Sequence, residues 1–216
     1  MGTSGWLYDW NEGGDLRWYV ERSGLNAVEL NASFYRFPFP SQVKGWARAG
    51  SGLRWAIKVH RSVTHVHRLN ERGLEVLRKF LRLFEPMHGL IDFYLVQLPP
   101  NFALNEQSLR RLGDLASVEL GGGRFAVEFR HESWFTEDAA REVSRLGLVF
   151  VSVDSPLGSY IYNSGGTVYL RMHGRSAWYA HDYTEAELDE VIGRVLGLSP
   201  AQVYVFFNND HWMLED

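Results

Sequence analysis

Cysteine is absent from this sequence of 216 residues. Its absence excludes a disulfide framework, a thiolate zinc site and a cysteine nucleophile, and it is compatible with the reducing cytoplasm. Long apolar runs are absent as well, since no stretch approaches the roughly 18 consecutive apolar residues of a membrane span. Residues 1–6 also lack the basic and apolar regions of a signal peptide. We therefore predict a cytoplasmic protein that makes no membrane contact.

An excess of basic residues is also absent: 22 lysines and arginines face 26 acidic residues, which gives a net charge of -4 and an isoelectric point near 6.1. Nucleic-acid binding without sequence preference normally needs a basic face, so this balance argues against it and leaves open only a local basic pocket. Apolar and aromatic residues, in contrast, are plentiful, at 45% and 14%. That content is enough for one well-packed core, and we predict that residues 1–216 form a single domain.

Strand-like and helix-like segments alternate along the whole chain. Strands are predicted near residues 1–3, 25–31, 53–60, 93–98, 125–129, 148–154, 167–173 and 202–209. Helices are predicted near residues 15–24, 41–49, 71–84, 105–118, 136–146 and 184–196. Asp15, Thr136 and a capping box formed by Thr184 and Glu187 mark three of the helix starts. Residues 155–166 are predicted to be an irregular insertion, and the repeated strand–helix units predict a parallel sheet.

Eight such units favour a closed TIM-type (β/α)8 barrel. An open doubly wound sheet is the alternative. In such a sheet the polar strand-end residues gather at the point where the strand order reverses, whereas in this sequence polar residues end nearly every strand. A typical barrel of this type has about 250 residues, with a lower limit near 200. We therefore predict a trimmed barrel that lacks most of the helix after the eighth strand. Apolar surface beside the first and eighth strands would then be covered by a second copy, in a homodimer.

The segment 124–134 carries the most informative polar residues. Glu128 lies in an otherwise apolar, β-prone run that follows three glycines, which predicts a carboxylate in a buried strand. Because side chains alternate across a strand, Glu128 and Arg130 point to the same face at its end. A structural ion pair that closes the strand end explains this pair equally well. The functional interpretation gains weight because other strands end in the same way, as at Lys58 and His60.

The carboxyl ends of all strands in a barrel converge on one pocket, so we expect the strand-end residues to meet there. The predicted catalytic residues are Glu29, Lys58, Glu128, Asp154 and His173. The predicted substrate-binding residues are Ser4, Trp6, Asn31, Tyr35, Gln97, Arg130, Trp134, Arg171 and Asn208. Each also has a structural interpretation: the acids and cations as ion pairs, the amides as bridges between strands, and the aromatic residues, with Phe34 and Trp178, as packing.

Several of these residues belong to motifs that together resemble the DUF72 family, also called YecE-like proteins. The motifs are GTSGW at residues 2–6, ELN at 29–31 followed by FY at 34–35, VEFR at 127–130 with Trp134, DSP at 154–156, LRMHG at 170–174 and FNN at 207–209. They span the chain in order. The resemblance implies a TIM-type barrel with a charged pocket at the carboxyl face. It implies no activity, because the family is best known as one of unknown function.

Three functions remain open for such a pocket. The first is an enzyme that acts on a small anionic substrate, with Arg130 and Arg171 binding a phosphate or carboxylate and Glu29 or Glu128 acting as base. No motif calls for a cofactor. The second is a divalent-metal-dependent hydrolase or isomerase of phosphoesterase type, whose ligands would be Glu29, Glu128, Asp154 and His173. The third is a non-catalytic module that binds a ligand or associates with nucleic acid through the aromatic rim. A zinc site at His60, His65 and His67 is a weaker alternative.

Overall fold

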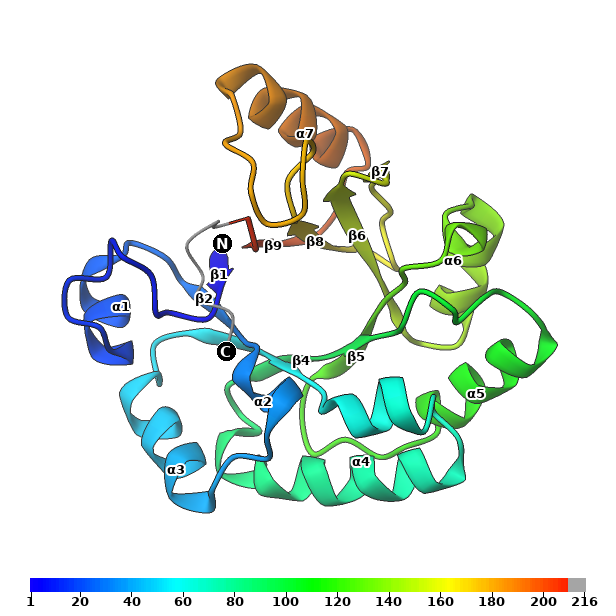
Figure 1. Ribbon diagram of the computed structural model, residues 1–216, viewed down its shortest axis with the longest axis horizontal. Coiled ribbons are helices and arrows are strands. Elements are labelled where there is room, and N and C mark those ends of the chain that lie inside the picture. The colour runs from blue at the N-terminus through cyan, green and yellow to red at the C-terminus, as the bar shows by residue number, and fades with distance from the viewer. Residues whose placement is uncertain (210–216) are drawn as a thin grey trace.

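The computed structural model describes residues 1–209 and shows a closed ring of parallel strands (Figure 1). The strands lie in the order β5-β4-β3-β2-β1-β9-β8-β6, and β5 also pairs with β6, which closes the ring. They are β1 (Gly2–Ser4), β2 (Ala27–Leu30), β3 (Arg54–Lys58), β4 (Ile91–Gln97), β5 (Arg124–Glu128), β6 (Val149–Ser155), β8 (Thr167–Met172) and β9 (Gln202–Phe207). The predicted TIM-type barrel is confirmed. The alternative of an open sheet is wrong, because β5 pairs with β6.

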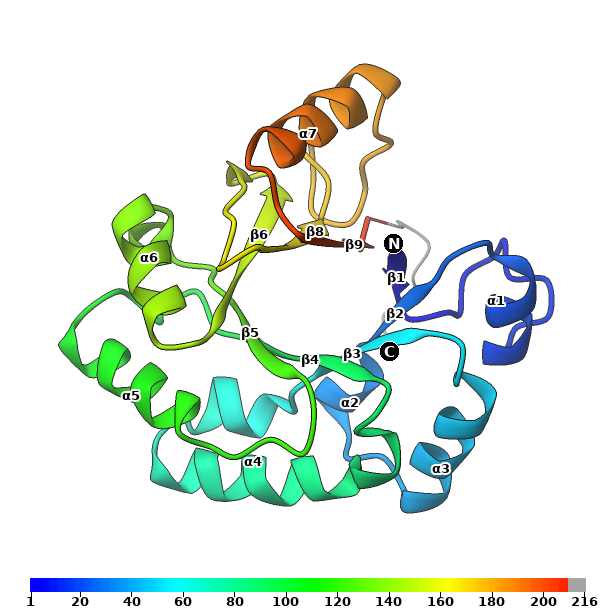
Figure 2. The same ribbon diagram turned by 180° about the vertical axis from the view of Figure 1, so that it is seen from behind.

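Helices surround the strands on the outside of the ring (Figures 1 and 2). They are α1 (Leu16–Arg22), α2 (Ala32–Tyr35), α3 (Pro40–Ala49), α4 (Glu71–Leu83), α5 (Glu106–Ala116), α6 (Glu137–Arg145) and α7 (Glu185–Gly197). Shorter turns are the π-helix η1 (Ser62–Val66) and the 3-10 helices η2 (Glu85–Met87) and η3 (Glu132–Trp134). Asp15, Thr136 and Thr184 each accept a hydrogen bond from a backbone N–H of the first turn, so all three predicted starts are confirmed. No helix within residues 1–209 is both long and apolar enough to cross a membrane.

Side chains alternate between the barrel interior and the helix layer. The interior contains apolar residues around Phe93, Tyr169 and Phe206 at mid-height. Outward side chains such as Trp55 and Ile57 pack into the larger core beneath the helices. Because the interior is filled by side chains, charged groups can meet only at the two ends of the barrel, where the strands begin and where they end.

One region differs from the sequence prediction, and another prediction cannot be compared with the structure. The insertion at residues 155–166 is partly regular, since β7 (Gly158–Tyr160) pairs antiparallel with β6 as a short hairpin. Beside β9 and β1, between α7 and α1, Figure 1 shows no described helix. The predicted truncation after the last strand falls on residues 210–216, which lie outside the described residues. Ile192 and Leu196 of α7 and Val203 of β9 are exposed.

Candidate active site

A fully buried group of charges lies at the carboxyl ends of the strands. Arg171 on β8 donates one hydrogen bond to Glu29 on β2 and another to Glu128 on β5, each at 2.5 Å. All three side chains have no solvent exposure. Arg130, two residues after Glu128 and on the same face, pairs with that carboxylate at 2.6 Å. The strand-end acids and arginines therefore form one network, and three of its members come from strands that are not neighbours.

The network sets the charge of Glu128. Burial alone would raise the pKa of this carboxyl, but Arg130, Arg171 and His173 outweigh burial and hold the pKa well below its usual value. For Arg171, burial lowers the pKa, but the attraction of Glu128 and Glu29 outweighs burial and raises the pKa above its usual value. The guanidinium therefore stays charged. At neutral pH Glu128 is therefore an ionised carboxylate whose charge is neutralised by the arginines around it.

His173 joins this layer as a neutral ring. Burial lowers its pKa to about 3, although Glu128 acts in the opposite direction. Its Nε2 lies 3.2 Å from Glu128, and its Nδ1 lies 3.2 Å from the side-chain nitrogen of Asn208. The tautomer with the proton on Nε2 fits both contacts, because Nε2 then donates to the carboxylate and Nδ1 accepts from the amide. His173 thus helps to fix the orientation of Glu128.

Two hydroxyl groups complete the surroundings of Glu29. Ser4 on β1 donates to one carboxylate oxygen at 2.9 Å, and Tyr169 on β8 donates to the other at 2.7 Å. The sequence interpretation missed Tyr169, although it has the same strand parity as Arg171 and His173. With these donors, both oxygens of Glu29 are occupied.

Lys58 differs from the other charges of the site because it has no direct partner. Its side chain is 8% exposed, and within residues 1–209 no carboxylate lies at ion-pair distance from its amine. The Nζ atom lies 4.4 Å from the ring centroid of Phe34, a cation–π contact. Burial, reinforced by Arg171, lowers the pKa of Lys58 to about 7, against the attraction of Glu128 and Glu29. The amine is therefore both charged and neutral in comparable amounts at neutral pH.

A cavity of about 400 Å³ opens above this layer. Its lining residues are Gln97, Pro100, Arg130, Leu157, Trp178 and Tyr179. The guanidinium of Arg130 lies over the Trp178 ring, 4.3 Å from its centroid. Nη2 of Arg130 pairs with Glu128 and lies 3.3 Å from Nε2 of His173, which as a donor does not accept from it. The buried Nε of Arg130 has no acceptor in the described part of the chain. Arg130 is thus the cationic group of the network that lines the cavity.

Asp154 does not lie with the other acids, which corrects the prediction. In the register between β6 and β8, Val153 pairs with the inward Arg171, so Asp154 pairs with Met172 and faces outward. There it accepts hydrogen bonds from Arg175 and from the Tyr183 hydroxyl, at 3.0 and 2.8 Å. Asp154 therefore anchors the segment after β8, which contributes Trp178 and Tyr179 to the cavity, and it does not line the cavity itself.

Three predicted aromatic residues also lie elsewhere. Trp134 is fully buried in the outer core, where it stacks on Phe129 at 4.0 Å and donates to the backbone of Phe102. Trp6 packs edge-on against the tryptophans of the helix layer. Tyr35 is exposed on α2 and is absent from the cavity lining. These side chains pack or face solvent because strand-end loops turn outward as well as inward.

Of the remaining polar residues that were predicted at the strand ends, one lines the cavity and two do not. Gln97 lines the cavity in register with Glu128. Asn31 follows β2 and begins α2, so it has left the strand. His60 was expected on the face of Lys58, but it hydrogen-bonds to Ser62 and packs against Phe37 outside the barrel. Within residues 1–209, no three His, Asp or Glu side chains converge as metal ligands would, including the four predicted ones and the three histidines.

A family model described as "Protein of unknown function DUF72" matches residues 1–213. The chain belongs to the DUF72 family. It is similar to a DUF72 family protein from Thermotoga maritima MSB8, with 28% identity, a TM-score of 0.77 and coverage of 96% of this chain and 91% of that one. Another DUF72 family protein, from Enterococcus faecalis V583, gives 22% identity, a TM-score of 0.79 and coverage of 98% and 90%.

A more distant likeness extends beyond the DUF72 proteins. A xylose isomerase domain containing protein from Salmonella typhimurium LT2 shares 16% identity, with a TM-score of 0.62 and coverage of 91% of this chain and 84% of that one. At this identity the likeness shows the barrel fold alone. No curated protein matches the DUF72 chain.

Proposed function

We propose that this DUF72 protein is an enzyme that acts on a small phosphate- or carboxylate-bearing compound in the cavity beside Arg130. The observation that carries the proposal is the state of that guanidinium. Arg130 lines the cavity, keeps 10% of its side chain exposed, is held in place by Glu128 and Trp178, and has partners within residues 1–209 only at Nη2. An oriented arginine with free donors is the side chain best suited to a planar or tetrahedral oxyanion.

The charge balance of the site also favours an anion. Glu29 and Glu128 face Lys58, Arg130 and Arg171, so the positive groups outnumber the negative ones while Lys58 is protonated. Asp154 is not part of this balance because it pairs with Arg175 on the other face of β6. A divalent ion would have to displace arginine contacts from both remaining acids. An anion needs no such rearrangement.

The residues of the buried layer take supporting roles in this proposal. Arg171 is occupied by both acids and has no exposure, so it orients Glu29 and Glu128 and leaves the contact with the anion to Arg130. Lys58 is assigned the proton transfer to or from the bound compound. A pKa of about 7 suits that role, since both protonation states are populated at neutral pH.

Binding is tested by thermal unfolding at constant ionic strength, with phosphate replacing chloride. Phosphate should raise the melting temperature of the wild-type protein. Arg130→Gln should reduce this shift by the contribution of the cavity, and Arg130→Lys should reduce it less, because lysine keeps the charge but not the two-pronged geometry of the guanidinium. Arg145→Gln is the matched control, since Arg145 forms an exposed pair with Glu142 and neither residue lines the cavity. Strong stabilisation by manganese or zinc, with none by phosphate, would overturn the proposal.

Catalysis needs a separate test. Small phosphate and carboxylate compounds that stabilise the protein should be incubated with it and followed by mass spectrometry. At least one should be converted, and Lys58→Met should abolish the conversion while retaining the thermal shift. Compounds that bind but are never converted would reduce the protein to a binding module.

A further inference from the structure

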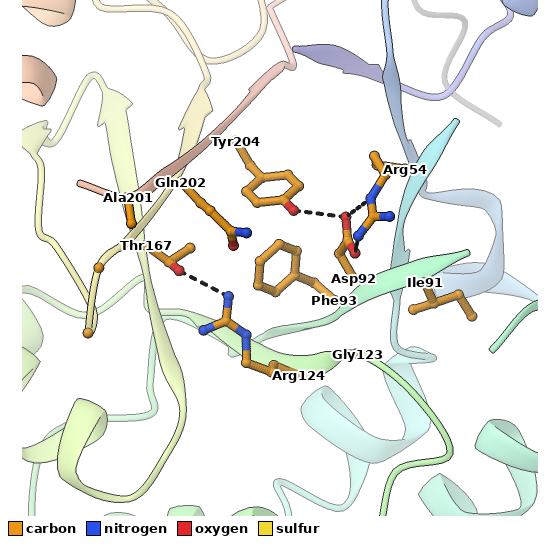
Figure 3. Close-up of a pocket in the computed structure, with 12 residues that line it drawn as sticks. Arg54, Ile91, Asp92, Phe93, Gly123, Arg124, Thr167, Ala201, Gln202 and Tyr204 are labelled. Atoms are coloured by element: carbon orange, nitrogen blue, oxygen red, sulfur yellow. Dashed lines mark hydrogen bonds and ion pairs between the residues drawn. The ribbon is translucent and has the colours of Figure 1, made fainter. Parts of the chain in front are cut away.

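A second cavity lies at the opposite end of the barrel, where the strands begin (Figure 3). Its volume is about 580 Å³, larger than that of the cavity beside Arg130. Arg54, Arg124, Thr167 and Gln202, which line it, are the first residues of β3, β5, β8 and β9. The sequence interpretation considered only the ends of the strands, so it assigned nothing to this mouth of the barrel.

The charges in this mouth are unevenly paired. Asp92, the acid among the lining residues, forms an ion pair with Arg54 and accepts a hydrogen bond from Tyr204 at 2.9 Å. Arg124 has only neutral contacts: its Nη2 donates to the Thr167 hydroxyl at 3.0 Å, and its guanidinium lies 5.2 Å from the Phe93 ring centroid. No carboxylate within residues 1–209 pairs with Arg124, so its charge is uncompensated.

The shape of the mouth leaves that charge accessible. Figure 3 shows the Arg124 guanidinium and the Gln202 amide both directed into the cavity, above a floor formed by the rings of Phe93 and Tyr204. The two rings meet edge to face at 4.7 Å, which closes the barrel interior beneath. The side-chain amide of Gln202 has no hydrogen-bond partner in the part of the chain that the structure describes, although its backbone N–H donates to Gly166.

A glycine keeps the rim open beside Arg124. Gly123 has a φ of +72°, and a Cβ there would lie 2.9 Å from the backbone oxygen of Asp92. Any other residue would therefore strain the backbone and crowd the start of β4. The backbone itself forms this side of the mouth, so a ligand can approach it closely.

We propose that the amino-terminal mouth of the barrel is a second binding site, for a small oxyanion-bearing compound held by Arg124. Gln202 donates a further hydrogen bond from its amide, and the Tyr204 ring contacts the less polar part of the ligand. A phosphate and a carboxylate share this chemistry, because each presents oxygen acceptors to a guanidinium with free N–H groups. The site stands on its own geometry and does not depend on the function proposed for the other end.

Phosphate titrations followed by 15N–1H NMR test this site separately from the other one. Glycine amides are well placed for the purpose, because Gly123, Gly165 and Gly166 line the mouth and Gly174 lies at the opposite end. At constant ionic strength, phosphate should shift the mouth glycines and the Arg124 Nε–H along a saturable curve. Acetate as a second probe distinguishes a general oxyanion site from one that requires phosphate.

Substitutions in the mouth and at a control position show whether Arg124 causes these shifts. Arg124→Gln should weaken binding at the mouth by about tenfold or more, as expected for loss of a charge-assisted hydrogen bond, and leave the response of Arg130 intact. Arg110→Gln, an exposed helix position, is the matched control. If Arg124→Gln fails to fold, Gln202→Ala at an exposed position should weaken mouth binding several-fold. Mouth resonances that stay still with both anions, or that shift equally in Arg124→Gln, would overturn the proposal.

Discussion

Glu128 on β5 and Arg171 on β8 form an ion pair of 2.5 Å in which neither side chain has any solvent exposure. The two strands are not neighbours, because β6 lies between them in the ring. The pair therefore crosses the end of the barrel, and the same arginine continues to Glu29. A buried charge is tolerated here only because each member has its partners.

Removing one charge of this network should be costly. Glu128→Gln leaves Arg171 and Arg130 without their shared carboxylate, and we expect a loss of about 3–5 kcal/mol in the free energy of unfolding. Urea unfolding measures this loss. Glu142→Gln, which breaks an exposed pair, should cost no more than about 1 kcal/mol. Equal effects of the two substitutions would mean that the buried network contributes little.

The lowered pKa of Lys58 predicts a specific pH dependence of stability. Between the folded value of about 7 and the unfolded value near 10.5, the unfolded chain binds a proton that the folded chain has released. Stability due to this group therefore rises with pH across that window and is flat below pH 7. Relative to Lys58→Met, the wild-type protein should gain about 1.4 kcal/mol per pH unit between pH 7.5 and 9.5. A constant difference between the two proteins would show an unshifted lysine.

Asp154 should act through the segment that follows β8. Asp154→Asn weakens the contacts with Arg175 and Tyr183, so we expect a moderate loss of stability, about 1–3 kcal/mol. Phosphate affinity beside Arg130 should fall only a few-fold. Glu190→Gln, which removes the exposed partner of Arg175, should have a smaller effect on both. Complete loss of phosphate binding in Asp154→Asn, with the fold intact, would place this acid back in the site.

Self-association remains a prediction that the structure does not test. Ile192 and Leu196 of α7 and Val203 of β9 are exposed, and Figure 1 shows no described helix beside β9 and β1 between α7 and α1. We expect a dimer at micromolar concentration by light scattering, and Leu196→Glu should shift it toward the monomer. A wild-type protein that is monomeric at this concentration would contradict the prediction.

The barrel itself could be predicted from the sequence because its signals are local. Helix caps such as Asp15 and Thr184 mark where helices begin, and apolar β-prone runs mark the strands. Glu128 was informative because the strand around it is apolar. Its position inside the barrel follows from Arg171, which reaches it from another strand.

The wrong predictions concern residues whose local sequence pattern does not show which way the side chain points. The strand before Asp154 is buried on both faces, so its sequence does not show which face turns inward, and only the register with β8 decides this. Trp178 and Tyr179 lie in an irregular segment whose path depends on contacts such as that between Asp154 and Arg175. The mouth cavity was missed because its residues begin strands, where the sequence was not searched for a site.

Arg130 is the residue that we propose to bind the anion, and the NMR signal of its Nε–H reports on that binding. This donor and the Nε–H of Arg171 both lack an acceptor in the described structure, but Arg130 lines the cavity and Arg171 lies fully buried beneath it. Assignment of the Arg130 signal is given by its loss in Arg130→Lys. We predict that phosphate at constant ionic strength shifts the Arg130 signal along a saturable curve and leaves that of Arg171 nearly unchanged. An Arg130 signal that does not move in high phosphate would rule out anion binding by Arg130.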